Sequence, residues 1–144
     1  MTSAEDLEYR SLNLLLVDDD DVDVMTVRRA FAKAGLSNAL YVASDGVEAL
    51  CMLREGRVPA ARRLVLLDLN MPRMNGIEFL RELRADEALR HTPVVVLTTS
   101  SADEDKVNAY EFNVAGYLIK PVTFSTFVDV MATLDRYWTL VEMP

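Results

Sequence analysis

The stretch LVLLDLNMPRMNG, residues 64–76, decides how this chain of 144 residues is predicted to fold. It begins with four consecutive apolar residues and then turns polar at Asp68. Proline, asparagine and glycine follow, after which Ile77, Leu80 and Leu83 recur at helical spacing. A short, continuously apolar run is typical of a parallel strand whose two faces are both covered by helices. The stretch therefore predicts one strand–loop–helix unit.

The same alternation of apolar run and helical pattern occurs five times along the chain. The predicted strands are residues 12–17, 39–43, 64–67, 94–97 and 117–119. Right-handed crossovers leave few topologies for such units. The pattern favours an α/β fold: a flavodoxin-like, doubly wound (βα)5 parallel sheet with strand order 2-1-3-4-5. We expect one domain over residues 1–144, with a core of about 11–138 and a short extension at each end.

The helical segments are recognised by their apolar spacing. The fourth is predicted to start near Ala102. Within the second we expect Cys51 to pack in the core beside Leu50. The residues that mark the other segments are Val24, Val27, Phe31 and Ala34 in the first, Val47, Leu50 and Cys51 in the second, and Phe127, Met131, Leu134 and Trp138 in the last.

The net charge of the chain argues against some classes of binding partner. The chain carries 23 acidic and 15 basic residues, a net charge of -8, so most of its surface should repel nucleic acid and anionic membrane. A single cysteine excludes an internal disulfide and suits a reducing compartment. There is no apolar run of membrane-spanning length, and the first ten residues, MTSAEDLEYR, form a mostly polar, acidic segment. We therefore expect a cytoplasmic protein that binds neither nucleic acid nor membrane.

Polar residues follow the predicted strands at the edge where ligands bind in open α/β sheets. Strand 1 ends at Asp18 and Asp19, and strand 3 ends at Asp68. Strands 4 and 5 end at Thr98 and Lys120. Neighbouring carboxylates either share protons or hold a hard cation, and oxygen ligands without histidine or cysteine favour Mg²⁺. Beside Mg²⁺, a lysine and a hydroxyl, Asp68 could accept a phosphoryl group.

The nearby acidic residues have simpler interpretations. Asp20 or Asp21 can cap the first helix, and Asp23 suits its positive first turn. His91, which precedes Thr92 and Pro93, is interpreted as a surface residue.

Four segments together resemble response-regulator receiver domains of the CheY-like type. The segments, in order, are LLLVDDDD (14–21), LVLLDLNMPRMNG (64–76), VVVLTTS (94–100) and GYLIKPV (116–122). The resemblance implies that Asp68 is the phospho-acceptor and that Asp18 and Asp19 are the acidic metal-binding pair. It also implies further roles: a metal-binding backbone carbonyl at Asn70, a phosphate-contacting hydroxyl at Thr98, a phosphate-pairing lysine at Lys120, a cis bond before Pro121 and a switch aromatic at Tyr117. Thr99 departs from the alanine or glycine usual at its position.

The resemblance implies a stand-alone response regulator that accepts its phosphoryl group from a sensor histidine kinase. Three features together resemble single-domain receivers paired with phytochrome-type kinases: the VLTTS run, the loop before strand 3 (residues 57–63) and Arg136-Tyr137-Trp138. Other implied partners are a downstream target or phosphotransfer protein and a second copy, bound through the C-terminal helix and fifth strand. Shuttle, switch and phosphate-sink roles stay open.

Two other classes of function stay open as alternatives. A haloacid-dehalogenase-like phosphohydrolase would also use an aspartate nucleophile and Mg²⁺. It should carry a second acid two residues after that nucleophile, where this chain has Asn70. The other alternative is a pseudo-receiver that works without phosphate, against which the acidic pair, Thr98 and Lys120 count.

Overall fold

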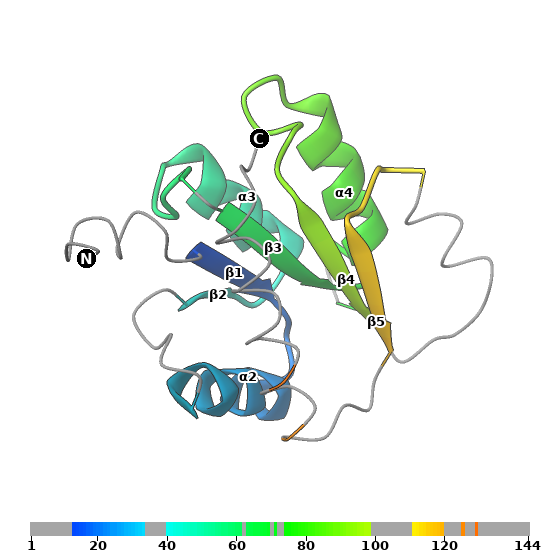
Figure 1. Cartoon of the computed structure of the whole chain (residues 1–144). Helices are drawn as coiled ribbons and strands as arrows, with labels where there is room; N and C mark the ends of the chain where they lie inside the picture. The colour runs from blue at the N-terminus through cyan, green and yellow to red at the C-terminus, as the bar shows by residue number, and fades with distance from the viewer. Residues whose placement is uncertain are drawn as a thin grey trace, which may run out of the picture.

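One five-stranded parallel sheet forms the centre of the molecule (Figure 1). The computed structural model describes residues 13–33, 40–61, 63–69, 71, 74–98 and 111–119, together with Ser125 and Asp129. The spatial order is β2-β1-β3-β4-β5, which confirms the predicted topology. The strands are β1 (Asn13–Val17), β2 (Leu40–Ala43), β3 (Arg63–Asp68), β4 (Val94–Thr98) and β5 (Gly116–Ile119).

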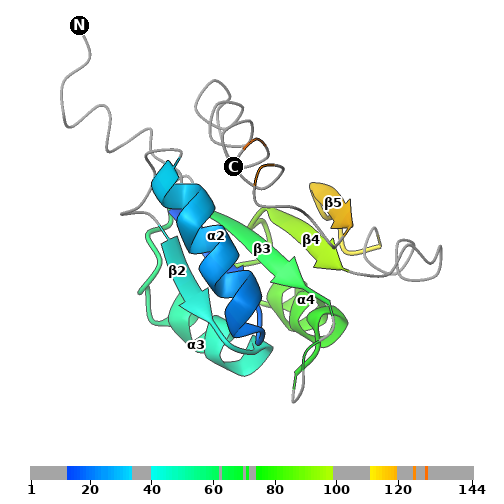
Figure 2. The ribbon, with the colours of Figure 1, turned by 90° about the horizontal axis from the view of Figure 1, so that it is seen from below.

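Three helices alternate with the first four strands and cover both faces of the sheet. They are α2 (Asp21–Lys33), α3 (Gly46–Arg54) and α4 (Gly76–Ala85). Helix α2 lies on one face, whereas α3 and α4 lie on the other (Figures 1 and 2). The predicted fourth helix lies outside the described residues, and of the predicted last helix only Ser125 and Asp129 are described, both helical. Among the helices described here, none has the length and apolar content needed to cross a bilayer.

The core consists of strand residues buried on both faces. Leu14 to Val17 in β1 and Leu64 to Leu67 in β3 have no exposed surface, which explains their unbroken apolar runs. Phe31 of α2 and Phe79 of α4 are the largest fully buried side chains among the described residues. Fully burying an apolar side chain of this size contributes about 1.5–3 kcal/mol. The alternation in the sequence thus reflects a sheet enclosed between two layers of helix.

Polar side chains start each described helix. Asp20 accepts hydrogen bonds from the backbone N–H groups of Val22 at 2.8 Å and Asp23 at 3.4 Å, which confirms that it caps α2. Asp45 accepts from the Glu48 N–H at 2.9 Å and caps α3. Asn75 and Glu78 form a reciprocal capping box on α4. These caps fix the points at which the helices leave the loops at the carboxyl ends of the strands.

The expectation that Cys51 packs in the core is wrong. Cys51 is exposed, as is Val47, with 41% of its surface accessible. The buried stripe of α3 runs instead through Ala49, Leu50 and Leu53. Both stripes have helical spacing, and Leu50 belongs to both, so periodicity alone could not decide which one faces the sheet.

Gly76 allows α4 to begin directly against the end of β3. Its N–H donates to the carbonyl of Leu69 at 3.0 Å, closing the loop that follows the strand. A Cβ atom at this position would lie 2.6 Å from the Leu69 Cα and 2.9 Å from the Asp68 carbonyl oxygen. Both neighbours are backbone atoms that no side-chain rotation can move away. The geometry of this loop therefore requires glycine.

Substituting Gly76 by alanine should destabilise the fold. We expect Gly76→Ala to lower the free energy of unfolding by about 1–3 kcal/mol, because the added methyl overpacks against backbone. Gly116→Ala is the matched control: its Cβ would meet only Val95 side-chain carbons, the nearest at 3.8 Å, and should change stability by less than about 0.5 kcal/mol. Urea denaturation of both variants measures the difference. Equal stability of the two would contradict the close approach.

Candidate functional site

The pairing of β1 with β3 brings two buried aspartates together. In the parallel register Val17 lies opposite Leu67, so the next residues, Asp18 and Asp68, leave neighbouring strands at the same edge of the sheet. Asp18 is 1% exposed and Asp68 is 4% exposed. Buried carboxylates are rare unless hydrogen bonds or charges compensate them. The structure thus places two of the predicted site residues side by side in the interior.

Backbone hydrogen bonds hold both aspartates at this edge. The Asp18 N–H donates to the Ala43 carbonyl at 3.0 Å, which extends the pairing of β1 with β2 by one residue. On the other side, the N–H of Leu69 donates to the Leu97 carbonyl at 3.3 Å, so the chain stays attached to β4 just beyond Asp68. The main chain on which each carboxylate is mounted is therefore fixed by the sheet.

A third carboxylate, that of Asp23, completes the group. One carboxylate oxygen from each of Asp18, Asp23 and Asp68 lies within 4.8 Å of the others. Asp23 is half-buried in the first turn of α2, and its position follows from the loop before it. In that loop the Asp18 carboxylate accepts a hydrogen bond from the Asp20 N–H at 2.9 Å, and Asp20 caps the helix. The turn thus brings Asp23 back over the end of β1.

From sequence, Asp23 is predicted only to interact favourably with the helix dipole; its place in the carboxylate group is not predicted. The sequence feature that indicates the position of Asp23 is its spacing from the end of β1. A helix that starts two or three residues after Asp18 presents its third residue back toward that strand. Asp19, which the resemblance pairs with Asp18, is exposed and does not belong to the three-carboxylate group found among the described residues.

The electrostatics of the three carboxylates favour a cation. Two unit negative charges 4.8 Å apart repel by on the order of 3 kcal/mol at an effective dielectric constant of about 20. Three such groups can be ionised together only with compensating positive charge among them. All three donors are carboxylate oxygens, the ligands that Mg²⁺, Mn²⁺ and Ca²⁺ prefer. The residues present therefore fit a hard divalent cation.

The remaining predicted site residues are placed only in part. Thr98 ends β4, one residue beyond Leu97, which lies opposite Asp68 in the β3–β4 register. Tyr117 lies in β5 opposite Val96. The main chain of both positions thus belongs to the strands that lead to the carboxylate edge.

Other predicted features lie outside the described residues: most of the predicted dimer surface, and Asn70, Thr99, Lys120 and Pro121. His91 is exposed, as predicted, at the opposite edge of the sheet.

Known proteins are similar to this chain in sequence and in fold. Residues 14–132 match the family model described as the response regulator receiver domain. A curated relative, the probable methanogenesis regulatory protein FilR2 of Methanothrix harundinacea, is 40% identical over 127 residues, which covers 87% of this chain and 82% of FilR2.

Two solved structures extend the comparison. The phosphorylated cyanobacterial phytochrome response regulator RcpA is 31% identical, with a TM-score of 0.78 over 93% of this chain and 99% of RcpA. The manganese-bound form of Rcp1, a response regulator known from Synechocystis, is 32% identical, with a TM-score of 0.73 over 91% of this chain and 97% of Rcp1. Sequence and fold agree, and the chain belongs to the response regulator receiver domain family, a family of signalling modules.

Proposed function

We propose that this chain accepts a phosphoryl group on Asp68 from a sensor histidine kinase and passes the signal on by protein contact. The observation that carries the proposal is the burial of Asp68 at the end of β3, within reach of the Asp18 and Asp23 carboxylates. A buried carboxylate surrounded by other acids has little value for stability, but it has value as a nucleophile held beside a cation. Family membership supports this reading over the phosphohydrolase alternative.

Mg²⁺ is the proposed cofactor. Asp18, Asp23 and Asp68 would supply its carboxylate ligands, and the backbone carbonyl of Asn70 is a further proposed ligand. Asp19 stays a candidate from the resemblance, and its exposed position suits contact through a water molecule. When bound, the cation would neutralise oxygen charge on the entering phosphoryl group. The manganese found in Rcp1 supports a divalent cation site in this family.

The chemical step needs one nucleophile held in position. A carboxylate oxygen of Asp68 would attack phosphorus, forming a P–O bond as the bond from phosphorus to the histidine nitrogen breaks. The pairing of β3 with β1 and β4 keeps the Asp68 main chain fixed, which limits the entropy lost on reaching the in-line geometry. Lys120 and the Thr98 hydroxyl are the proposed contacts for the phosphoryl oxygens once the group has been transferred.

The proposed output is a shift between two arrangements of the chain that exist before phosphorylation. Phosphate on Asp68 would favour the arrangement in which Thr98 and Tyr117 turn toward the site. These residues lie in β4 and β5, which are adjacent strands in register, so a change at one strand has a direct route to the other. A target, a phosphotransfer protein or a second copy could read that change. The proposal includes a homodimer formed through the C-terminal helix and fifth strand.

A phytochrome-type kinase is the proposed partner. RcpA, a phytochrome response regulator by name, matches over nearly the whole chain and supports this choice. FilR2, however, is named as a regulator of methanogenesis and has the higher identity, 40%. A direct transfer assay therefore tests the pairing with a phytochrome-type kinase.

Phosphorylation of Asp68 should be visible on Phos-tag gels. With acetyl phosphate or a phosphorylated histidine kinase as donor, we expect a slower-migrating band that requires Mg²⁺ and is lost in Asp68→Asn, because the amide is not a comparable nucleophile. Glu82→Gln, which removes an exposed carboxylate on α4, should keep the band. Full labelling of Asp68→Asn would refute the assignment.

Mg²⁺ should stabilise the folded chain through the three carboxylates. At a concentration 100 times its dissociation constant, a cation that binds only the folded state adds about 2.7 kcal/mol. We expect thermal unfolding to show this gain in the unmodified chain and a much smaller one in Asp68→Asn and Asp23→Asn. Asp21→Asn is the matched control, because Asp21 is exposed on the same helical turn and outside the group. An undiminished gain in Asp23→Asn would exclude Asp23 from the site.

Light should control phosphotransfer if the partner is a phytochrome-type kinase. We expect the rate of label transfer to Asp68 from such a kinase to differ between red and far-red light. A histidine kinase without a light-sensing domain serves as the control and should transfer at the same rate in both. Equal rates with the phytochrome kinase would overturn the pairing while leaving the phospho-acceptor role of Asp68 intact.

A further inference from the structure

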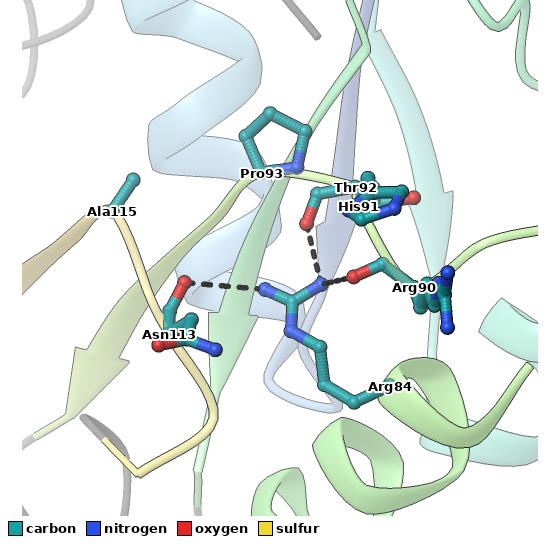
Figure 3. A pocket seen from close by; sticks show the side chains of 7 residues that line it. All are labelled: Arg84, Arg90, His91, Thr92, Pro93, Asn113 and Ala115. Carbon is teal, nitrogen blue, oxygen red and sulfur yellow. Dashed lines mark hydrogen bonds between the residues drawn. The ribbon is translucent and has the colours of Figure 1, made fainter.

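A hollow lined by two arginines lies at the opposite edge of the sheet from Asp68. It has a volume of about 300 Å³ and is lined by Arg84, Arg90, His91, Thr92, Pro93, Asn113 and Ala115 (Figure 3). These residues come from the end of α4 and from the two loops that enter β4 and β5. The five-residue strand β4 separates this edge from the carboxylate edge by about 16 Å. The hollow is thus distinct from the proposed phosphorylation site.

Arg84 is the fixed element of this hollow. Its Nε donates to the Phe112 carbonyl at 2.7 Å, and its Nη1 donates to the carbonyls of Thr92 at 2.7 Å and Arg90 at 3.0 Å. Its Nη2 makes a longer contact, 3.4 Å, to the Asn113 carbonyl. These four contacts leave one of the five N–H donors of a guanidinium. The group is therefore held rigidly while one donor and a full positive charge remain.

Among the described residues, no carboxylate is paired with the arginines of this hollow. Within the described part of the chain, neither Arg84 nor Arg90 forms an ion pair; the two recorded pairs join Arg54 to Asp86 and Arg57 to Glu55. Burial lowers the pKa of Arg84, which indicates that its charge is partly removed from water. Carbonyl dipoles satisfy hydrogen bonds but carry no net charge. A bound anion would supply the negative charge with which neither arginine is paired among the described residues.

A second hollow of about 290 Å³ shows which side of Arg84 suits an anion. It shares Arg84, Arg90, His91 and Asn113 with the first hollow but is also lined by Glu111 and Phe112. The Glu111 carboxylate opposes an anion there. On the first side the additional residues are Thr92, Pro93 and Ala115, none of them acidic. The charge pattern favours the first hollow.

We propose that the hollow between Arg84, Arg90 and Asn113 binds a small oxyanion, a phosphate or carboxylate group. Its volume is at the lower limit of about 300 Å³ for ligand pockets, which suits inorganic phosphate or a small organic acid better than a nucleotide. Arg84 would form the fixed floor. The exposed side chains of Arg90 and His91 would close over the anion from the rim. In a chain with a net charge of -8, such a site depends on the positive charges of Arg84 and Arg90.

A titration followed by NMR tests the proposal independently of Asp68. The full chain carrying Asp68→Asn is ¹⁵N-labelled, kept free of Mg²⁺, and titrated with inorganic phosphate, with citrate and, at matched ionic strength, with chloride. We expect saturable shifts of the Asn113 and Ala115 amides with phosphate, citrate or both, and not with chloride. Saturation by phosphate alone identifies a phosphate site, and saturation by citrate alone identifies a carboxylate site.

Variants at the rim separate a site from general attraction to positive charge. Arg90→Ala removes an exposed side chain and should weaken binding by about tenfold, the effect of losing one charge-assisted hydrogen bond. His91→Gln provides a second test at the rim and should weaken binding less. Arg81→Ala, an exposed arginine of α4 that does not line the hollow, should leave the affinity unchanged. Shifts that never saturate with either anion, or equal affinity in Arg90→Ala, would overturn the proposal.

Discussion

The parallel pairing of β1 with β3 is the constraint on which the rest of the site depends. The register that places Val17 opposite Leu67 also places Asp18 beside Asp68. Because a shift of one residue would turn every side chain to the other face of the sheet, the apolar residues that fill the core also fix the position of the carboxylates. Core packing and site geometry are thus set by the same hydrogen bonds.

The same constraint creates a conflict between stability and chemistry. Asp18 and Asp68 are almost completely buried and directly follow buried apolar residues of β1 and β3, where two leucines would be more favourable for folding. The fold accommodates them at a strand end, where the Asp18 carboxylate accepts the Asp20 N–H and the first turn of α2 supplies Asp23. Such concentrations of acid are retained where a cation and a reaction make use of them.

Much of the fold could be predicted from the sequence because burial on both faces leaves a plain pattern. Five apolar runs gave the strands and their order, including the polar residues at the carboxyl ends. The positions of individual side chains were harder to predict from the sequence. Leu50 lies on two equally apolar helical stripes, so the exposure of Cys51 depended on how α3 packs. Asp23 entered the acidic group only through the turn set by Asp18 and Asp20, a three-dimensional relation that residue type does not reveal.

The bonds from Arg84 to the carbonyls of residues 90, 92, 112 and 113 also bear on how this chain can vary in length. The acceptors are main-chain atoms, so the side chains of these four residues can change while the contacts persist. An inserted or deleted residue, by contrast, would move a carbonyl out of reach of a guanidinium that cannot follow it. The loops entering β4 and β5 should therefore tolerate substitution but not insertion, which makes this edge a poor position for grafting foreign loops.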